Sequence, residues 1–163
     1  MTLAELNAMP QYRAEEELLK CCGAKAWARA MARRRPFASH DRMAKAAGEI
    51  WWRLHESDWL EAFAAHPQIG ESKAGPAQGW SAQEQSGMSR AAAAVTTELA
   101  QANRDYLAKF GFIFIVCASG KPADEMLTIL RARLANLPDQ ELRIAAEEQS
   151  KITLLRLGKL VSL

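Results

Sequence analysis

Apolar residues recur at intervals of three and four along most of this chain, and that spacing predicts amphipathic helices. Between residues 41 and 55, for example, the apolar positions are Met43, Ala46, Ala47, Ile50, Trp51 and Leu54. Breaks in the pattern fall at prolines and glycines. They divide the chain into expected helices over residues 2–10, 12–22, 25–35, 41–55, 58–66, 88–111, 122–137 and 138–160. The sequence therefore predicts an all-α single-domain bundle of about seven or eight helices over residues 1–163.

Several of these boundaries have a local cause. Thr2 and Glu5 have the spacing of a capping box, which predicts the first helix start. Ser57 is expected to cap the helix that follows it. That helix should end near His66, because Pro67 disfavours helical backbone in the residue before it. Gly111 is the expected terminator of the long helix over 88–111.

One stretch departs from the helical pattern. Residues 112–118, FIFIVCA, are β-branched or aromatic for the most part and are followed by a Ser-Gly turn. A strand here would have no second strand with which to pair, and its backbone groups would be left without partners. We therefore expect a buried extended segment between helices, whose N–H and C=O groups find other partners.

Composition narrows the class of protein. A net charge of +2 over 163 residues gives no reason to expect a nucleic-acid partner. The three cysteines, Cys21, Cys22 and Cys117, have neither disulfide-framework nor zinc-site spacing. The N-terminus lacks a signal-peptide pattern, and the longest apolar run is too short to span a bilayer. These features favour a cytoplasmic protein with no membrane role.

Most catalytic motifs are missing. His40, His55 and His66 never stand four residues apart, and His55-Glu56 is followed by Trp59 where a zinc-binding His-Glu-x-x-His motif needs its second histidine. There is no phosphate-binding glycine loop. A Cys117–His66 nucleophile pair is possible, but a thiol in an apolar run is usually inert. We expect neither a metal nor a cofactor.

The stretch from Ala64 to Met88 is the least helical and most polar part of the chain. Its ordinary interpretation is a helix stop at His66-Pro67 and a capping box at Ser81 and Glu84. Extra polar side chains at Gln83, Gln85 and Ser86 favour a second interpretation, in which this turn binds a small anion. One His and one Glu without a metal motif would then suit proton transfer. The pattern alone leaves both interpretations open.

Four blocks in order, HPQIG, SAQEQSGM, NRDYLAKFGFIFIVCASGK and ELRIAAEEQSKITLLRL, resemble the family of 2-oxo-4-hydroxy-4-carboxy-5-ureidoimidazoline (OHCU) decarboxylases. The resemblance covers nearly the whole chain, including NAMP and RRRPF near its start. It implies an all-α bundle, commonly a homodimer. The implied activity is cofactor-independent decarboxylation of OHCU to (S)-allantoin in urate degradation.

The same resemblance implies a set of site residues. His66 matches the catalytic histidine and Glu84 the catalytic carboxylate. The implied substrate-binding residues are Pro67, Ser81, Ala82, Gln83, Gln85, Phe114, Ile115, Val116, Cys117, Ala118 and Arg156. Many relatives read Ala-Arg-Gly where this chain reads Ala118-Ser119-Gly120, so Arg156 is expected to carry more of the anion recognition.

Two alternatives compete with this function. The chain could be a non-catalytic helical interaction module whose Trp51, Trp52 and Trp59 form a binding surface. It could also be another lyase or hydrolase of small ureides on the same scaffold. Production of dextrorotatory allantoin without added metal would distinguish these alternatives from OHCU decarboxylation.

Overall fold

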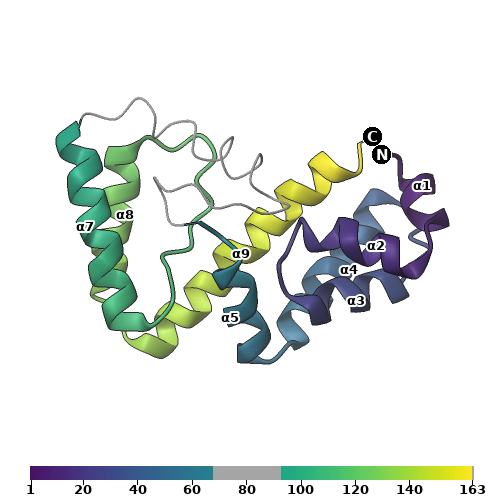
Figure 1. Cartoon of the computed structure of the whole chain (residues 1–163), viewed down its shortest axis with the longest axis horizontal. Coiled ribbons are helices and arrows are strands. Elements are labelled where there is room, and N and C mark those ends of the chain that lie inside the picture. The colour runs from purple at the N-terminus through teal and green to yellow at the C-terminus, as the bar shows by residue number, and fades with distance from the viewer. Residues whose placement is uncertain (68–92, 163) are drawn as a thin grey trace. The chain divides into compact units, whose positions relative to one another are not determined.

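The computed structural model describes residues 1–67 and 93–162, which contain helices and irregular segments but no strand (Figure 1). The predicted all-α class is confirmed. The eight helices of the described residues are α1 (Leu3–Ala8), α2 (Gln11–Leu19), α3 (Lys25–Arg33), α4 (His40–Arg53), α5 (Glu56–Ala64), α7 (Ala93–Phe110), α8 (Ala123–Leu134) and α9 (Pro138–Leu160).

The chain divides into two compact units. Unit 1 comprises residues 1–65 and 149–163, and unit 2 comprises residues 66–148. Helix α9 contributes its first part to unit 2 and its second part to unit 1. The single domain over residues 1–163 stays a prediction. No helix in the described ranges is long and apolar enough to cross a membrane.

Side chains at the starts of α1, α4 and α5 explain where these three helices begin. The Thr2 hydroxyl accepts from the Glu5 N–H at 3.2 Å, and the Glu5 carboxylate accepts from the Thr2 N–H at 2.7 Å, so the predicted capping box is confirmed. The expected cap at Ser57 is wrong. Helix α5 begins earlier, after His55, because the Asp58 carboxylate accepts from the His55 N–H at 3.2 Å. Ser57 therefore lies inside the first turn.

Most predicted helix ends lie two or three residues after the observed ones. Helix α2 ends at Leu19 rather than residue 22, because the chain tightens into a turn in which the Cys21 N–H donates to the Leu18 carbonyl at 2.9 Å. That turn buries both Cys21 and Cys22. Helix α5 ends at Ala64, two residues before His66. Gly111 follows α7 with φ of +79°, as expected of a helix terminator; residues 88–92 of that predicted helix lie outside the described ranges.

Unit 1 is built on aromatic side chains from neighbouring helices. The buried Trp27 indole on α3 donates to the Ala47 carbonyl of α4 at 3.2 Å. The Trp59 indole on α5 donates to the Trp51 carbonyl at 3.0 Å, and its ring lies 5.6 Å from that of Trp52. These tryptophans pack between the helices, and the indoles of Trp27 and Trp59 have hydrogen-bond partners. Their contacts within unit 1 give little support to the alternative of an interaction module with a tryptophan binding surface.

Unit 2 is built on the pair α7 and α8, which lie side by side in Figure 1. Residues 111–122 run back along this pair (Figure 1). Lys109 near the end of α7 donates to the Leu134 carbonyl at the end of α8. The core of unit 2 consists of Leu99, Ala102, Tyr106, Phe114, Val116, Ala118, Met126, Leu127 and Leu130. The expected extended segment therefore passes through this core.

Candidate active site

The irregular segment after α7 alternates between two faces. Phe114, Val116 and Ala118 belong to the core cluster of unit 2, whereas Ile115 and Cys117 do not. This period of two is the signature of an extended chain, in which successive side chains point to opposite faces. The prediction of a buried extended segment is confirmed, with Cys117 only half-buried.

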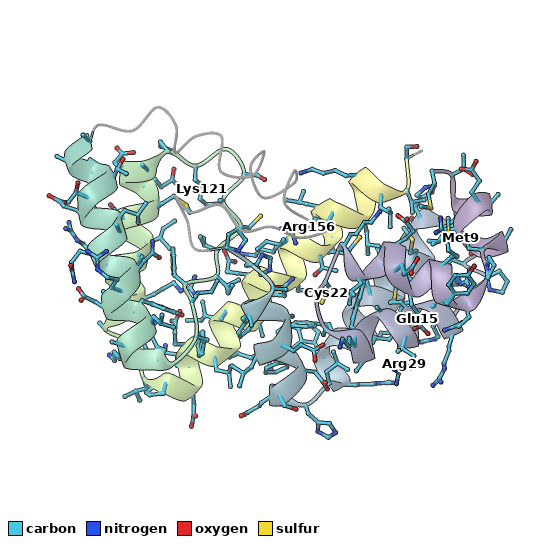
Figure 2. All side chains as sticks on the ribbon, viewed as in Figure 1. Met9, Glu15, Cys22, Arg29, Lys121 and Arg156 are labelled. Carbon is cyan, nitrogen blue, oxygen red and sulfur yellow. The ribbon has the colours of Figure 1, made fainter. Side chains whose placement is uncertain are left out.

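One edge of this segment bonds to side chains. The Ile115 carbonyl accepts from Arg133 Nη1 at 2.5 Å. The Cys117 N–H donates to Glu148 Oε1 at 3.1 Å, and its carbonyl accepts from Lys121 Nζ at 2.8 Å. Figure 2 shows Lys121 where the segment approaches α8. Side chains therefore supply the partners that a neighbouring strand would otherwise provide.

The other edge of the segment carries Phe114 and Val116, because N–H and C=O groups of alternate residues point the same way in an extended chain. Across residues 1–67 and 93–162, neither backbone group of either residue makes a hydrogen bond. Both residues are buried, at 3% and 7% exposure. Buried backbone N–H and C=O groups need hydrogen-bond partners. This edge is therefore suited to bind the polar groups of a ligand.

Arg133 on α8 is held by a buried carboxylate. Its Nε donates to Glu141 Oε1 at 2.5 Å, and the Arg133 and Glu141 side chains are only 8% and 0% exposed. Glu141 also accepts from the Tyr106 hydroxyl at 2.5 Å and from Asn136 Nδ2 at 3.0 Å. The guanidinium lies 4.6 Å from the centre of the Phe114 ring. Burial, and then the bond to Glu141, raise the pKa of Tyr106 well above its ordinary value, so the phenol stays a donor.

His66 and Pro67 follow directly on α5. The helix closes with Ala65 as its C-terminal cap, and both His66 and Pro67 are half-buried. The expected helix stop at this proline is therefore confirmed. Ser81, Ala82, Gln83, Glu84 and Gln85 lie outside the described residues, so their part in the site stays a prediction.

Arg156 lies in unit 1, on the second part of α9 (Figure 2). Its side chain is buried, with the residue 3% exposed. Burial raises the pKa of the nearby Cys22 thiol to about 12, and the Arg156 charge acts in the opposite direction. A buried arginine is costly to desolvate, which favours a specific role for it.

Arg133, Glu141, Glu148 and Lys121 were not among the predicted site residues. A signal for two of them existed in the sequence. Arg133 stands three residues after Leu130 on the buried face of α8, and Glu141 stands four residues before Ala145 on that of α9. A charged residue at an apolar-face position is a candidate for a buried pair. Nothing in the pattern marked Glu148 or Lys121.

Comparison with known proteins identifies the family. The sequence profile described as OHCU decarboxylase matches residues 7–158. The chain belongs to the OHCU decarboxylase family. The resemblance of the four sequence blocks to this family is thereby confirmed.

Individual relatives agree with this family. The chain is 42% identical over 154 residues to the uric acid degradation bifunctional protein TTL of Arabidopsis thaliana, covering 91% of this chain but 47% of that protein. It is 31% identical over 131 residues to the 2-oxo-4-hydroxy-4-carboxy-5-ureidoimidazoline decarboxylase of Amia calva, covering 78% of this chain and 75% of the relative. The chain thus spans about half the length of its bifunctional relative.

Solved structures share the fold. A structure described as OHCU decarboxylase in the presence of (S)-allantoin is 43% identical, with a TM-score of 0.80, covering 89% of this chain and 96% of its own. A structure described as (S)-allantoin synthase is 20% identical, with a TM-score of 0.77, covering 99% of this chain and 54% of its own, and it supports the fold alone.

Proposed function

We propose that this OHCU decarboxylase family member removes CO₂ from 2-oxo-4-hydroxy-4-carboxy-5-ureidoimidazoline and releases (S)-allantoin, as a step of urate degradation. Two relatives with 42% and 31% identity carry names from this chemistry. A 43% identical structure pairs the family name with (S)-allantoin. The observation that carries the site assignment is the edge of the extended segment at Phe114 and Val116, where buried backbone groups make no hydrogen bond within the described residues.

The substrate supplies its own electron sink. Its ring carries a carboxylate and a hydroxyl on one carbon, beside a carbon doubly bonded to nitrogen. When CO₂ leaves, the electron pair delocalises into that C=N bond as an enol-like intermediate. The protein must then add orientation, charge placement and one stereospecific proton. Side chains and backbone groups of the chain are sufficient for these tasks.

His66 is the proposed proton donor. It delivers a proton to the ureido-bearing carbon from one side only, which sets the (S) configuration of allantoin. The position suits this task, because the carbonyl end of a helix attracts cations and His66 follows the cap of α5. Pro67 fixes the backbone on its other side and lies against the substrate.

Glu84 is the proposed partner for the substrate hydroxyl. It accepts that hydrogen bond, takes up the hydroxyl proton as the carbonyl forms, and passes this proton to the ring nitrogen that received the electron pair from the departing CO₂. The proposed turn around it consists of Ser81, Ala82, Gln83 and Gln85. The backbone of residues 114–118 binds ring N–H and oxygen groups, and the arginine at position 156 pairs with the substrate's negative charge. The buried, apolar surroundings of residues 114–116 favour departure of neutral CO₂.

Substitution of His66 tests the function. His66→Asn should lower turnover of freshly generated OHCU about 10²- to 10⁴-fold, the usual contribution of a positioned general acid. Turnover is followed by the circular dichroism of (S)-allantoin, with EDTA present and urate oxidised in the same cuvette. His55→Asn is the matched control, because His55 is exposed and asparagine is an equally good helix cap.

The outcomes separate the candidate functions. Wild-type and His55→Asn chains that produce (S)-allantoin, with His66→Asn nearly silent, support the proposal. A wild-type chain that does not accelerate (S)-allantoin formation would refute it and favour the interaction module. Turnover of a different ureide by the wild-type chain would favour another lyase or hydrolase on this scaffold. Normal turnover by His66→Asn would reassign the proton donor.

We also infer a cytoplasmic homodimer that binds neither nucleic acid nor membranes. The family resemblance supports the dimer, and the small net charge of +2 agrees with a small-molecule substrate rather than a polyanion. Sedimentation equilibrium of the purified chain tests the dimer. A mass of one chain at micromolar concentration would contradict it.

A further inference from the structure

One buried cation bonds to the backbone of the extended segment of unit 2. Arg133 reaches its backbone from α8 and bonds the Ile115 carbonyl at 2.5 Å. Two further bonds at Cys117 come from half-buried side chains, Glu148 at 3.1 Å and Lys121 at 2.8 Å. Of these three partners Arg133 is the most deeply buried, so water competes least with its bond.

The surroundings of Arg133 fix its guanidinium in one orientation. Glu141 accepts from its Nε, and the central guanidinium carbon lies 4.6 Å from the centre of the Phe114 ring and 5.8 Å from that of the Tyr106 ring. Glu141 is itself fixed by bonds from Tyr106 and Asn136. The planar fork of an arginine is suited to holding a carboxylate with one edge and a carbonyl with the other. Arg133 therefore has one geometry in which all its partners are satisfied.

Stability alone does not explain this pair. A buried ion pair loses hydration and is frequently no more stabilising than apolar residues of similar volume. What it gains is specificity: a slip by one residue would move Phe114 and Val116 from the core face to the opposite face. In the native register the bond from Arg133 to the Ile115 carbonyl and the burial of the Phe114 and Val116 side chains occur together, so the bond adds to the preference for that register.

We propose that Arg133 is a positioning residue for the reaction. Held by Glu141, it fixes the Ile115 carbonyl on one edge of the segment, and this sets where the N–H and C=O of Val116 stand on the other edge. Arg133 itself does not contact substrate; it acts through the backbone. This inference rests on the proposed function, in which that second edge binds the substrate.

Arg133→Lys tests the role, because lysine keeps the charge for Glu141 but lacks the fork. The expected result is a fall in kcat/KM for OHCU of about ten- to a hundredfold, the cost of a small misplacement of binding groups. Hydrogen–deuterium exchange of a peptide covering residues 112–118 should also become faster in the unliganded chain. Arg131→Lys is the matched control, since Arg131 is on the same helix but exposed, paired with Glu98 at 3.0 Å.

A second variant guards against a failure to fold. Arg133→Met combined with Glu141→Gln removes both charges together, so no unpaired buried charge remains, and the glutamine still accepts from Tyr106. This double variant should unfold cooperatively and show the same loss of kcat/KM, because the bond to Ile115 is absent. Leu99→Ala, a cavity elsewhere in the unit 2 core, measures the effect of destabilisation by itself.

The results distinguish the two proposals. Loss of kcat/KM and faster exchange in both Arg133 variants, with Arg131→Lys and Leu99→Ala near wild type, support positioning. Wild-type values in a folded double variant, or an equal loss in Leu99→Ala, overturn it while leaving the decarboxylase assignment intact. A wild-type chain without turnover overturns the proposed function and, with it, the substrate-facing part of this inference.

Discussion

Gly23 and Ala65 approach so closely that a Cβ atom on Gly23 would overlap the Cβ of Ala65. Both residues belong to unit 1, and Ala65 is the C-terminal cap of α5, directly before His66 in the chain. The turn after α2 therefore sets how the end of α5 is placed. Gly23, far from His66 in the sequence, therefore helps to fix the position of the backbone directly before His66.

This contact predicts the effect of Gly23→Ala. The added methyl group should lower the free energy of unfolding by about 1–3 kcal/mol, the usual cost of overpacking. It should also reduce turnover at temperatures where the chain is folded, because the displaced Ala65 carries His66 with it. Urea denaturation and steady-state kinetics measure the two effects.

A compensating change at the contact provides the control. In Gly23→Ala combined with Ala65→Gly, the methyl group has room, so part of the stability and turnover should return. Non-additivity of this kind is expected only between residues in contact. Equal losses in the single and double variants would contradict the steric explanation.

Tyr106→Phe should destabilise unit 2 by about 1–3 kcal/mol at neutral pH, because the buried Glu141 carboxylate loses a hydrogen bond. The difference should narrow above about pH 10, the ordinary pKa of a tyrosine. The pKa of Tyr106 is raised in the folded chain, so only the unfolded phenol ionises there, and wild-type stability falls with rising pH. Urea denaturation across the alkaline range measures the difference in stability between wild type and Tyr106→Phe. A difference that grows with pH would refute the role of the Tyr106 hydroxyl as a donor to Glu141.

The thiols of Cys21 and Cys22 should be unreactive in the folded chain. Both residues are 0% exposed, and burial raises the pKa of Cys22 to about 12 and that of Cys21 further. Ellman's reagent at pH 8 should modify at most Cys117 in the native chain and all three thiols in denaturant. Rapid native modification of two or more thiols would contradict the described burial.

The same two thiols predict a loss of stability in alkali. Because their pKa values are raised in the folded chain, their contribution is complete below the ordinary thiol pKa of about 9 and is lost as the pH rises above it. Cys21→Ala should therefore lose less stability than wild type between pH 8 and pH 10. An unchanged pH dependence in this variant would argue against a role for Cys21.

Asn7→Ala should cost about 1–3 kcal/mol of stability without changing kcat/KM. The Asn7 amide both donates to the Phe37 carbonyl at 2.9 Å and accepts from the Phe37 N–H at 2.8 Å, which ties α1 to the chain after α3. Asn7→Asp keeps the acceptor and loses the donor, so its stability should be intermediate. Thermal denaturation ranks the three chains, and an inactive but folded Asn7→Ala would show that this contact does more than stabilise unit 1.

The sequence predicted most helices because their apolar spacing and their caps agree, as at Thr2 and Glu5. It misplaced the end of α2, since Cys21 and Cys22 continue the apolar pattern although they pack in a turn. It missed the start of α5, since Ser57 and Asp58 both offer a cap near His55. At both places the sequence offers several local hydrogen bonds, and its apolar pattern does not distinguish the one that the folded chain forms.

The site shows the same division. A pattern could predict that residues 112–118 are buried and extended, because their composition excludes a helix and no strand partner exists. It could not predict which side chains bond their backbone, because Arg133 and Glu148 are 18 and 31 residues away along the chain from the groups they bind. Contacts of that range depend on the three-dimensional path of the chain.

The hydrogen bonds from side chains to the backbone of the extended segment have an evolutionary consequence. The side chains of Arg133, Glu148 and Lys121 all form hydrogen bonds with main-chain N–H or C=O groups. Every amino acid except proline carries both of these groups. A substitution at position 117, other than to proline, therefore leaves the main-chain groups that Glu148 and Lys121 bind in place. Selection on the path of this segment would then act on three side chains, of which Arg133 and Glu148 are far from it in the sequence and Lys121 is four residues away.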